Sequence, residues 1–401
     1  MAEVRRHAVV AGAGIGGLAA ALALHRSGWR VTVCERAPGP TSVGAGIVLA
    51  PNALRAFDTI GFDATRAAGR AVPAAMGLRR PDGRWLNRAD TAAMTARYGR
   101  PPLAVHRAAL TDALAAALPE GTVRYATTVT AVTAVDPADG GPVVRTTAGD
   151  LTADLAVAAD GIHSPLRRRH FPDHPGLRYS GETAWRTVLP ADGAAVAAAA
   201  ETWGRGERFG IVPLADGRTY VFATAVTPAT DPGGRHPEDA RAELLSRFGA
   251  WHEPIPALLE RIDPAAVLRH DLYDLAAPLP RYHRGRLAWL GDAAHAMTPN
   301  LGQGGCQAVE DAVVLAHLLS GAGTSGVPAA LAAYSAARCA RTDAVRVRSR
   351  RAGRVAAVTH PLAAAVRDLA VRAVPARAAR RATDDLFDGF TLPAVTAPIG
   401  A

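Results

Sequence analysis

A glycine-rich turn between an apolar strand and a helix constrains the fold of this chain more than any other feature. The turn reads Gly12-Ala13-Gly14-Ile15-Gly16-Gly17 and follows an apolar run. Gly12 permits a tight turn, Gly14 lets the backbone approach a pyrophosphate, and Gly17 lets helix and strand pack closely. The spacing predicts the first βαβ unit of a nucleotide-binding sheet.

An acidic residue strengthens this interpretation. A second strand, predicted over residues 29–34, ends at Glu35, which can accept hydrogen bonds from an adenosine ribose. The free N–H groups at the N-terminus of the helix favour phosphates. The alternative is a glycine loop that only closes a βαβ unit. Strand, helix and acid fall together where a dinucleotide site requires them.

Length and composition set the remaining bounds. The 401 residues, 49% of them hydrophobic, allow two or three subdomains of a globular protein. We expect no membrane span, because no apolar run of about 18 residues occurs. We also expect no secretory signal, because residues 1–8 are polar and lead directly into the first strand. Three cysteines without metal-ligand spacing predict no metal site and a reducing, cytoplasmic location.

Positive charge is concentrated near the C-terminus. All 45 basic residues are arginines, and residues 338–381 hold twelve of them against Asp343 and Asp368. Such a segment can bind nucleic acid or anionic lipid. We favour a solvated helical face and expect no nucleic-acid partner, because no aromatic residue interrupts the segment before Phe387.

The pattern along the chain alternates between helical and strand-like regions. A glycine-bearing loop and a helix are predicted over 41–57, and a helix over 106–118. Strands and turns are predicted over 72–105, with a hairpin turn at 81–83, and over 122–160 and 177–275, with a turn at 216–217. A buried strand at 287–290 and a helix at 309–319 follow. From residue 331 onward the pattern is helical, interrupted near Pro361 and Pro375.

Two further motifs carry chemistry. An apolar strand at 155–159 ends in Asp160-Gly161-Ile162-His163-Ser164, followed by arginines at 167–169 that could meet phosphates. The alternative is a plain strand-to-helix turn. The second motif begins at Gly291-Asp292, where Asp292 could bond a polyol hydroxyl. It continues through Pro299 to the glycines at 302, 304 and 305, where a helix N-terminus favours anionic charge.

Together these motifs resemble the class A, single-component FAD-dependent monooxygenases, which have the fold of p-hydroxybenzoate hydroxylase and include salicylate- and urate-hydroxylase-like enzymes. The resemblance rests on G-A-G-I-G-G with Glu35-Arg36, on D-G-I-H-S-x-x-R, and on G-D-A-A-H-x-x-x-P-x-x-G-Q-G, in the family's order. It extends from Arg6 to about Ala340.

The resemblance implies an α/β fold with a discontinuous, Rossmann-like FAD-binding domain over 1–75, 100–175 and 280–335. A β-sheet substrate-binding domain would occupy 76–99 and 176–279, and a C-terminal helical segment 336–401. It also implies the residues that hold FAD: Gly12, Gly14, Ile15, Gly16, Gly17, Glu35, Arg36, Val48, Arg107, Val129, Asp160, Asp292, Gly302, Gly304 and Gly305.

The activity so implied is insertion of one oxygen atom from O2 into an aromatic or unsaturated small molecule through a flavin C4a-hydroperoxide. NADH or NADPH would dock transiently as the electron donor, and the chain would be a monomer or homodimer. Two alternatives stay open: a related epoxidase or dehydrogenase of a terpenoid-like substrate, and a non-catalytic flavin-binding accessory protein.

The substrate should lie against the middle strands. Arg208 could pair with an anionic or carbonyl-bearing substrate, and Tyr220 could relay a phenol proton; a surface arginine and a core tyrosine are equally compatible with the sequence. Pro299 would frame the flavin. Trp185 is expected in the core, His295 and His163 in structural roles, and His106 and Cys306 in packing.

Overall fold

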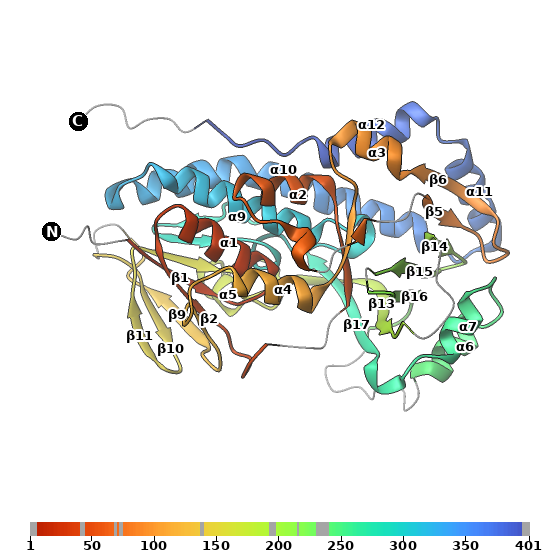
Figure 1. Cartoon of the computed structure of the whole chain (residues 1–401), viewed down its shortest axis with the longest axis horizontal. Coiled ribbons are helices and arrows are strands. Elements are labelled where there is room, and N and C mark those ends of the chain that lie inside the picture. Colours follow the sequence, from red (N-terminus) through yellow and green to blue (C-terminus); the bar gives the residue numbers. More distant parts are fainter. Residues whose placement is uncertain are drawn as a thin grey trace.

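The computed structural model describes residues 6–40, 45–67, 70–71, 75–136, 140–191, 198–214, 216–229 and 240–394. Two halves follow one another along the long axis of the molecule: a nucleotide-fold half at the left in Figure 1 and a large sheet at the right. Residues 41–44 of the predicted glycine loop and residue 215, beside the predicted turn at 216–217, lie outside the described residues.

A six-stranded sheet forms the centre of the first half. Its strands are β18 (His283–Arg284), β19 (Leu287–Trp289), β12 (Leu155–Ala158), β1 (His7–Ala11), β2 (Arg30–Cys34) and β8 (Val123–Arg124), in that order. All pairs are parallel except β18 with β19. The parallel strands are buried apolar runs, as expected for a sheet covered by helices.

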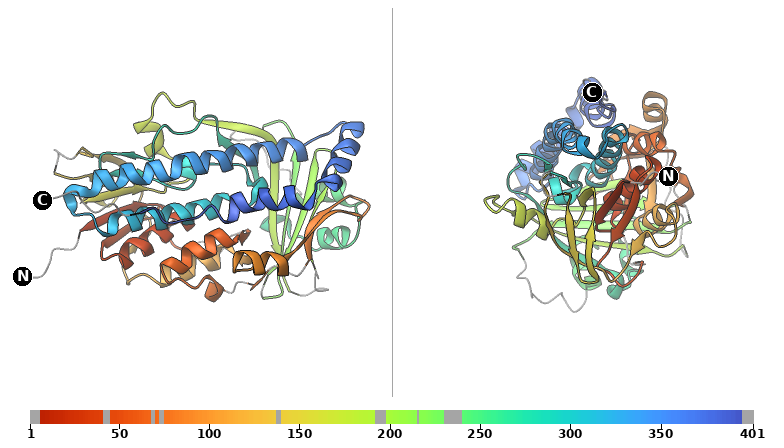
Figure 2. Two further views of the ribbon diagram at one scale, coloured as in Figure 1. Left: turned by 90° about the horizontal axis from the view of Figure 1, so that it is seen from above. Right: turned by 90° about the vertical axis from the view of Figure 1, so that its left-hand side faces the viewer.

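Two helices from distant parts of the chain cover this sheet. α1 (Ile15–Arg26) packs against α9 (Gly304–Ser320), and both bury most of their residues. The close approach requires Gly16, because a Cβ there would lie 2.9 Å from Leu290 and 3.1 Å from Ala308. α10 (Val327–Ala356), thirty residues long, packs beside α9 and runs along both halves of the molecule (Figure 2).

A seven-stranded sheet forms the second half. In sheet order it comprises β17 (Leu268–Leu275), β13 (Leu177–Leu189), β16 (Thr219–Val226), β15 (Glu207–Pro213), β14 (Ala199–Trp203), β5 (Ala75–Arg79) and β6 (Trp85–Asp90). α6 (Ala240–Phe248) and α7 (Ile255–Glu260) supply apolar residues to its core. Trp185 belongs to that core and is 1% exposed, as predicted.

Two three-stranded sheets complete the β-structure. One comprises β11 (Gly149–Thr152), β10 (Val143–Thr146) and β9 (Val129–Thr133); the other comprises β3 (Gly46–Leu49), β7 (Leu103–His106) and β4 (Arg70–Ala71). β3 lies against the large sheet, because a Cβ on Gly46 would lie 2.5 Å from the ring of Tyr220.

The remaining α-helices connect these layers. They are α2 (Pro51–Thr59), α3 (Thr91–Tyr98), α4 (Arg107–Ala116), α5 (Pro165–His170), α8 (Asp292–His295), α11 (Pro361–Ala373) and α12 (Ala376–Phe387). The helical breaks near Pro361 and Pro375 and the turn at 81–83 are confirmed.

Three helices were missed by the sequence prediction. Strands and turns were predicted over 72–105 and mainly strands over 177–275, but α3, α6 and α7 lie within those regions. Asp90 starts α3 by accepting a hydrogen bond from the backbone N–H of Ala92 at 2.8 Å. Short alanine-rich and mixed segments of six to nine residues give too little periodicity to separate helix from strand.

Candidate functional site

The glycine turn after β1 brings backbone close to backbone. Gly12 has φ +105°, and a Cβ there would lie 2.5 Å from the carbonyl oxygen of Ala159. A Cβ on Gly17 would collide with the carbonyl of Gly12. Gly14 has open space around it, and no side chain caps the N-terminus of α1. The first N–H groups of α1 are therefore free to bind an anion.

Glu35 supports this turn directly. The backbone N–H of Ala13 donates to its Oε2 at 2.7 Å, and the N–H of Ala37 donates to its Oε1 at 2.9 Å. Each carboxylate oxygen keeps a further lone pair for a ribose hydroxyl. Glu35 thus fixes the glycine turn in addition to the ligand-binding role that the sequence predicts.

Asp160 follows β12 at the same edge of the sheet. Its Oδ2 accepts from the N–H of Leu166 at 3.3 Å, while Oδ1 is buried without a partner among the described residues. Burial raises the pKa of this carboxyl. A buried oxygen without a partner is costly, so Oδ1 is suited to a ligand that supplies a donor.

Arg167 does not serve as a free phosphate ligand. It is 2% exposed and donates to the carbonyl oxygens of Asp292 and Ala293 at 3.2 and 3.1 Å. The sequence had suggested that this arginine could meet phosphates. The guanidinium instead ties the second motif to the third.

The third motif presents an exposed acid and a helix N-terminus. Gly291 has φ +59°. Asp292, the first residue of α8, is exposed. Gly302 has φ +62° and ends the 3-10 turn of Pro299–Leu301. α9 then begins at Gly304 without a side-chain cap. A Cβ on Gly304 would lie 3.9 Å from Asp292 Oδ1, so acid and helix N-terminus are neighbours.

β3 closes over the start of α9. A Cβ on Gly305 would lie 2.8 Å from Ile47, and the N–H of Ala50 donates to Cys306 Sγ at 3.4 Å. Val48, which lies between Ile47 and Ala50 in the sequence, is half-buried. Burial raises the pKa of the Cys306 thiol to about 12, so this cysteine packs, as predicted, and is not a nucleophile.

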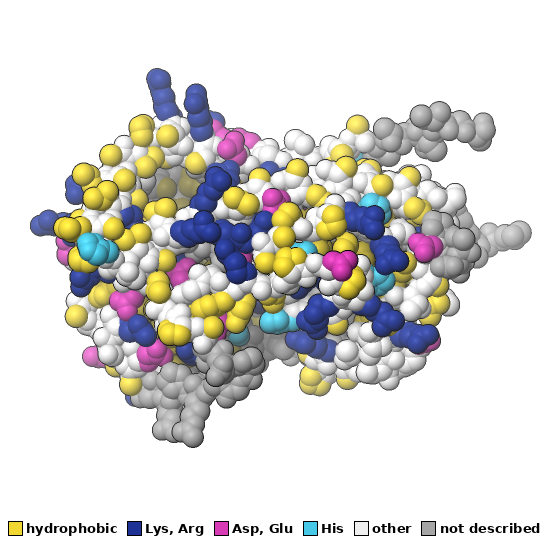
Figure 3. Space-filling model, turned by 180° about the vertical axis from the view of Figure 1, so that it is seen from behind, with side chains coloured by type: hydrophobic (Ala, Val, Ile, Leu, Met, Phe, Trp, Pro, Cys, Tyr) yellow, Lys and Arg dark blue, Asp and Glu magenta, His cyan; other side chains and the backbone are white. Residues whose placement is uncertain are grey.

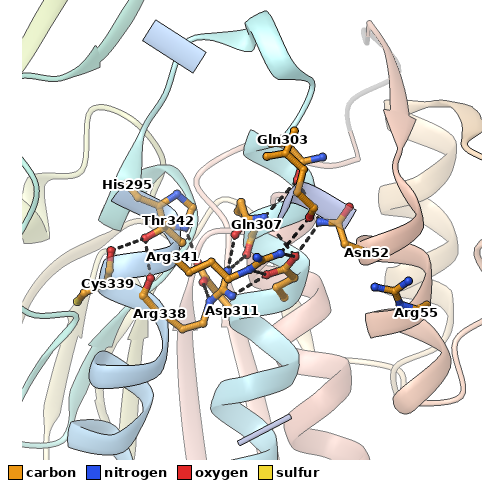
Figure 4. Close-up of polar contacts among 12 residues, drawn as sticks. Asn52, Arg55, His295, Gln303, Gln307, Asp311, Arg338, Cys339, Arg341 and Thr342 are labelled. Atoms are coloured by element: carbon orange, nitrogen blue, oxygen red, sulfur yellow. Dashed lines mark hydrogen bonds and ion pairs between the residues drawn. The ribbon is translucent and has the colours of Figure 1, made fainter. Parts of the chain in front are cut away.

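A buried polar network behind α9 was not predicted. Arg338 of α10 donates to Asp311 Oδ1 and Glu310 Oε2, both at 2.6 Å, and His295 Nε2 lies 2.6 Å from Asp311 Oδ2 (Figure 4). Burial opposes charge on Asp311, but His295 and Arg338 lower its pKa to about 2. His295 is therefore structural, as predicted.

The network continues toward the glycine turn. Asn52 Nδ2 donates to Gln303 Oε1 at 3.0 Å and to Glu310 Oε1 at 2.7 Å, which links α2 to the residue that precedes α9 (Figure 4). A signal was present in the sequence: Glu310 and Asp311 are adjacent acids inside an apolar helix, and such acids need buried cationic partners.

The arginine-rich segment is therefore not simply a solvated face. Arg338, Arg346 and Arg367 are 2%, 4% and 7% exposed and form ion pairs or backbone hydrogen bonds. The prediction of a solvated face was wrong for these three. Net charge over the segment could not distinguish them from its exposed arginines.

Arg208 and Tyr220 lie on the large sheet beside this region. Arg208 donates to Glu182 Oε1 at 2.7 Å, Asn300 Oδ1 at 2.7 Å and Thr224 Oγ1 at 2.9 Å, and it is 4% exposed. It is neither a surface arginine nor a free cation. Tyr220 is 7% exposed and packs against Gly46, and burial raises the pKa of its phenol.

The other predicted residues take varied positions. Arg36, Arg107, Pro299 and His163 are exposed, His106 is half-buried at the start of α4, and Ile15 and Val129 are buried. Two contacts bring the three motifs together: Gly12 packs against Ala159, and Arg167 donates to the carbonyl oxygen of Asp292. Asn300 of the third motif accepts a hydrogen bond from Arg208 of the large sheet. The roles of individual residues toward a cofactor remain predictions.

Two features that would indicate other functions are absent from the described residues. In that part of the chain, no helix combines the length and apolarity needed to cross a lipid bilayer. Nor do its histidines, cysteines and acids gather in groups of three or more that could hold a metal ion.

A family model for the FAD binding domain matches residues 5–349, and the chain belongs to this family. It is 41% identical over 366 residues to an aurachin C monooxygenase/isomerase of Stigmatella aurantiaca, covering 91% of this chain and 93% of that one. It is 34% identical over 387 residues to a 2-heptyl-3-hydroxy-4(1H)-quinolone synthase of Pseudomonas aeruginosa, covering 95% and 97%.

Solved structures agree. Klebsiella pneumoniae HpxO in complex with FAD and uric acid matches with a TM-score of 0.85 and 30% identity, covering 98% of each chain. A salicylate hydroxylase substrate complex matches with a TM-score of 0.75 and 26% identity, covering 98% and 99%.

These relationships make the chain an FAD-dependent monooxygenase with the predicted α/β fold. The alternatives of an epoxidase or dehydrogenase of a terpenoid-like substrate and of a non-catalytic accessory protein are not favoured. The residues fit FAD: Gly12 and Gly17 leave no room for a Cβ, Gly14 leaves open space beside the turn, Asp160 Oδ1 has no partner among the described residues, and the N-termini of α1 and α9 carry no side-chain cap.

Proposed function

We propose that this monooxygenase oxygenates an uncharged, hydrophobic aromatic heterocycle of the alkyl-substituted 4-quinolone type, with NADH or NADPH as transient electron donor. The observation that carries the proposal is the buried ion pair between Arg208 and Glu182. The one cation suggested for the substrate pocket already has a buried carboxylate partner.

Arg208 is poorly placed to bind a substrate carboxylate. Its side chain is 5% exposed, Glu182 is 4% exposed, and Glu201 Oε1 lies 3.5 Å from the guanidinium. All three sides of the planar group contact polar atoms of the protein. An anionic ligand would have to displace Glu182 and leave that acid buried and unpaired, which is unfavourable.

The surface beside Arg208 is apolar. Tyr220 and Phe222 lie on one face of β16, with ring centroids 5.7 Å apart. They belong to a cluster between the large sheet and β3, whose other members are Ala45, Val48, Met76, Ala104, Val188, Ala199, Val212 and Leu214. Such a surface favours a ligand that carries apolar area rather than charge.

Two relatives support the same substrate class. The synthase name specifies a quinolone that carries a heptyl chain and a 3-hydroxyl group, and the aurachin C enzyme is named as a monooxygenase. Insertion of one oxygen atom into the C3–H bond of a 2-alkyl-4(1H)-quinolone would give a product of the former kind. Urate hydroxylases match this chain at 31–34% identity, as the quinolone synthase does at 34%, but their named substrate is polar and does not suit the apolar surface of β16.

The cofactor would be held by the residues assembled above. Gly14 and the N-terminus of α1 would bind the pyrophosphate, Glu35 the adenosine ribose, and Asp292 the ribityl chain. Bound FAD supplies the redox chemistry that activates O2. The N-terminus of α9 would stabilise negative charge on the reduced ring through its free N–H groups. The domain division proposed above, over 1–75, 100–175 and 280–335 for FAD, assigns the Tyr220 surface to substrate.

The test is a panel of substrates scored by stimulated oxidation of NADH and NADPH, with mass spectrometry for one added oxygen. The probes are 2-heptyl-4(1H)-quinolone, uric acid and 3-amino-4-hydroxybenzoate. We expect stimulation and a product one oxygen heavier with the quinolone alone. If the benzoate or urate stimulates oxidation and the quinolone does not, the proposed substrate class is refuted, but the monooxygenase assignment stands.

Tyr220 can be tested in the same assay. Replacement of Tyr220 by Phe keeps the ring that packs on Gly46 and removes the hydroxyl. If the phenol relays a proton, its removal should lower kcat by about a hundredfold and leave KM and FAD content little changed. Unchanged kcat would assign Tyr220 to packing alone.

A further inference from the structure

α11 exposes apolar side chains and buries a charged one, the reverse of an ordinary surface helix. Leu362, Val366 and Leu369 are 72%, 67% and 68% exposed. Their spacing of four and three residues places them on one face of the helix. Val374, just beyond the helix, is 44% exposed. Large exposed apolar patches mark interaction sites.

The opposite face is anchored by Arg367. This residue is 7% exposed and donates to the carbonyl oxygens of Gly204 and Ala356 at 2.9 and 3.1 Å. It also pairs with Asp368 at 2.7 Å, and Asp368 lies 3.6 Å from Arg80. The helix orientation is therefore fixed by polar contacts, and its apolar stripe faces away from the protein.

Exposed positive charge lies close to this stripe along the chain. Five exposed arginines lie within α11 or the neighbouring helix ends: Arg351, Arg354, Arg372, Arg377 and Arg380. None of them forms an ion pair within the described ranges, and the acid on α11, Asp368, is already paired. In Figure 3, hydrophobic and basic side chains lie side by side at the left end, which corresponds to the right-hand end of Figure 1 where α11 lies.

We propose that the outward face of α11, defined by Leu362, Val366 and Leu369, docks on the surface of an anionic lipid bilayer. An apolar stripe flanked by basic residues inserts between headgroups while the arginines contact lipid phosphates. A second copy of the chain fits less well, because a two-fold contact through this stripe would bring like-charged arginines together.

The experiment is co-sedimentation of the FAD-loaded full chain with vesicles of phosphatidylglycerol and phosphatidylcholine, compared with vesicles of phosphatidylcholine alone. We expect binding to the anionic vesicles only. The triple variant Leu362→Ser, Val366→Ser and Leu369→Ser should bind roughly tenfold or more weakly. Leu392→Ser, at a residue 37% exposed elsewhere, should bind like the wild type.

Charge is tested separately. Arg372→Gln with Arg377→Gln should also weaken binding. Raising the salt from about 0.1 to about 1 M should do the same, because it shortens the Debye length from roughly 10 to 3 Å. FAD content and circular dichroism should not change in any variant, since all replaced side chains are exposed.

Three results would overturn the proposal. Wild-type protein that ignores anionic vesicles would do so, as would a triple variant that binds normally. A wild-type dimer that ignores vesicles and becomes monomeric in the triple variant would assign the stripe to self-association.

Discussion

The guanidinium of Arg208 lies between Glu182 and two neutral polar side chains, with almost no exposure to solvent. The sequence predicted that Arg208 could pair with an anionic or carbonyl-bearing substrate. It could not reveal Glu182, 26 positions earlier, because that pairing depends on the register of β13, β16 and β15. The residue types on this face of the sheet could be predicted, but their charge balance could not.

Arg208→Met should therefore destabilise the fold rather than act on KM alone. The change leaves Glu182 buried without its cation, which costs about 3–5 kcal/mol. Urea unfolding should show this loss, and the double variant Arg208→Met with Glu182→Met should recover much of it. A single variant of normal stability would show that the ion pair is unimportant.

Asp292 offers the complementary case of an exposed acid beside a helix N-terminus. Asp292→Ala should weaken FAD binding by roughly ten- to hundredfold, because it removes a charge-assisted hydrogen bond worth about 1.5–3 kcal/mol. Fluorescence titration of apoprotein measures this. Asp150→Ala, at an exposed acid on β11, should bind FAD normally.

At the scale of elements, the glycine motifs were predictable because their demands are local. Gly12, Gly291 and Gly302 all have positive φ, and Gly17 excludes any side chain through its own turn. The ends of α11 and α12 were predictable for a similar reason, since proline limits the backbone. The network of α9 and α10 depends instead on which side chains meet across helices.

That network gives a pH prediction. The folded-state pKa of Asp311 is about 2 against an ordinary value of 3.8. Its carboxylate therefore contributes stability that is fully present above about pH 4 and is lost as the pH falls toward 2. The difference in free energy of unfolding between wild type and Asp311→Asn should shrink by roughly 2 kcal/mol between pH 6 and pH 2.

Urea titrations at several pH values measure that difference, and Asp150→Asn is a control that should show no comparable pH dependence. A constant difference across the range would mean that Asp311 does not stabilise the fold through its charge.

At the scale of the whole molecule, the order of helices and strands along the chain was predicted better than the contacts between segments that are distant in the sequence. The strands predicted at 155–159 and 287–290 form β12 and β19; β12 pairs with β1, and β19 pairs with β12. The thirty-residue helix α10 crosses both halves, and its buried arginines were hidden within a run of exposed ones.

FAD should be bound without a covalent link and should stabilise the complete fold. Cys306 is buried with a raised pKa, and His295 is held by Asp311, so neither is available as an attachment point. Acid precipitation should release all flavin into the supernatant, and excess FAD should raise the melting temperature of apoprotein by mass action. Flavin retained in the pellet would contradict the first expectation.

The position of α9 in the sequence has a consequence for how the chain is made. α1 is complete at residue 26, but the helix that covers its apolar side begins at residue 304. At about 5–20 residues per second, a ribosome needs roughly 15 to 60 s to span that interval. Throughout that time the face of α1 that packs against α9 in the folded protein lacks its native cover, so the nascent chain depends on other apolar surfaces, including those of chaperones, until α9 emerges.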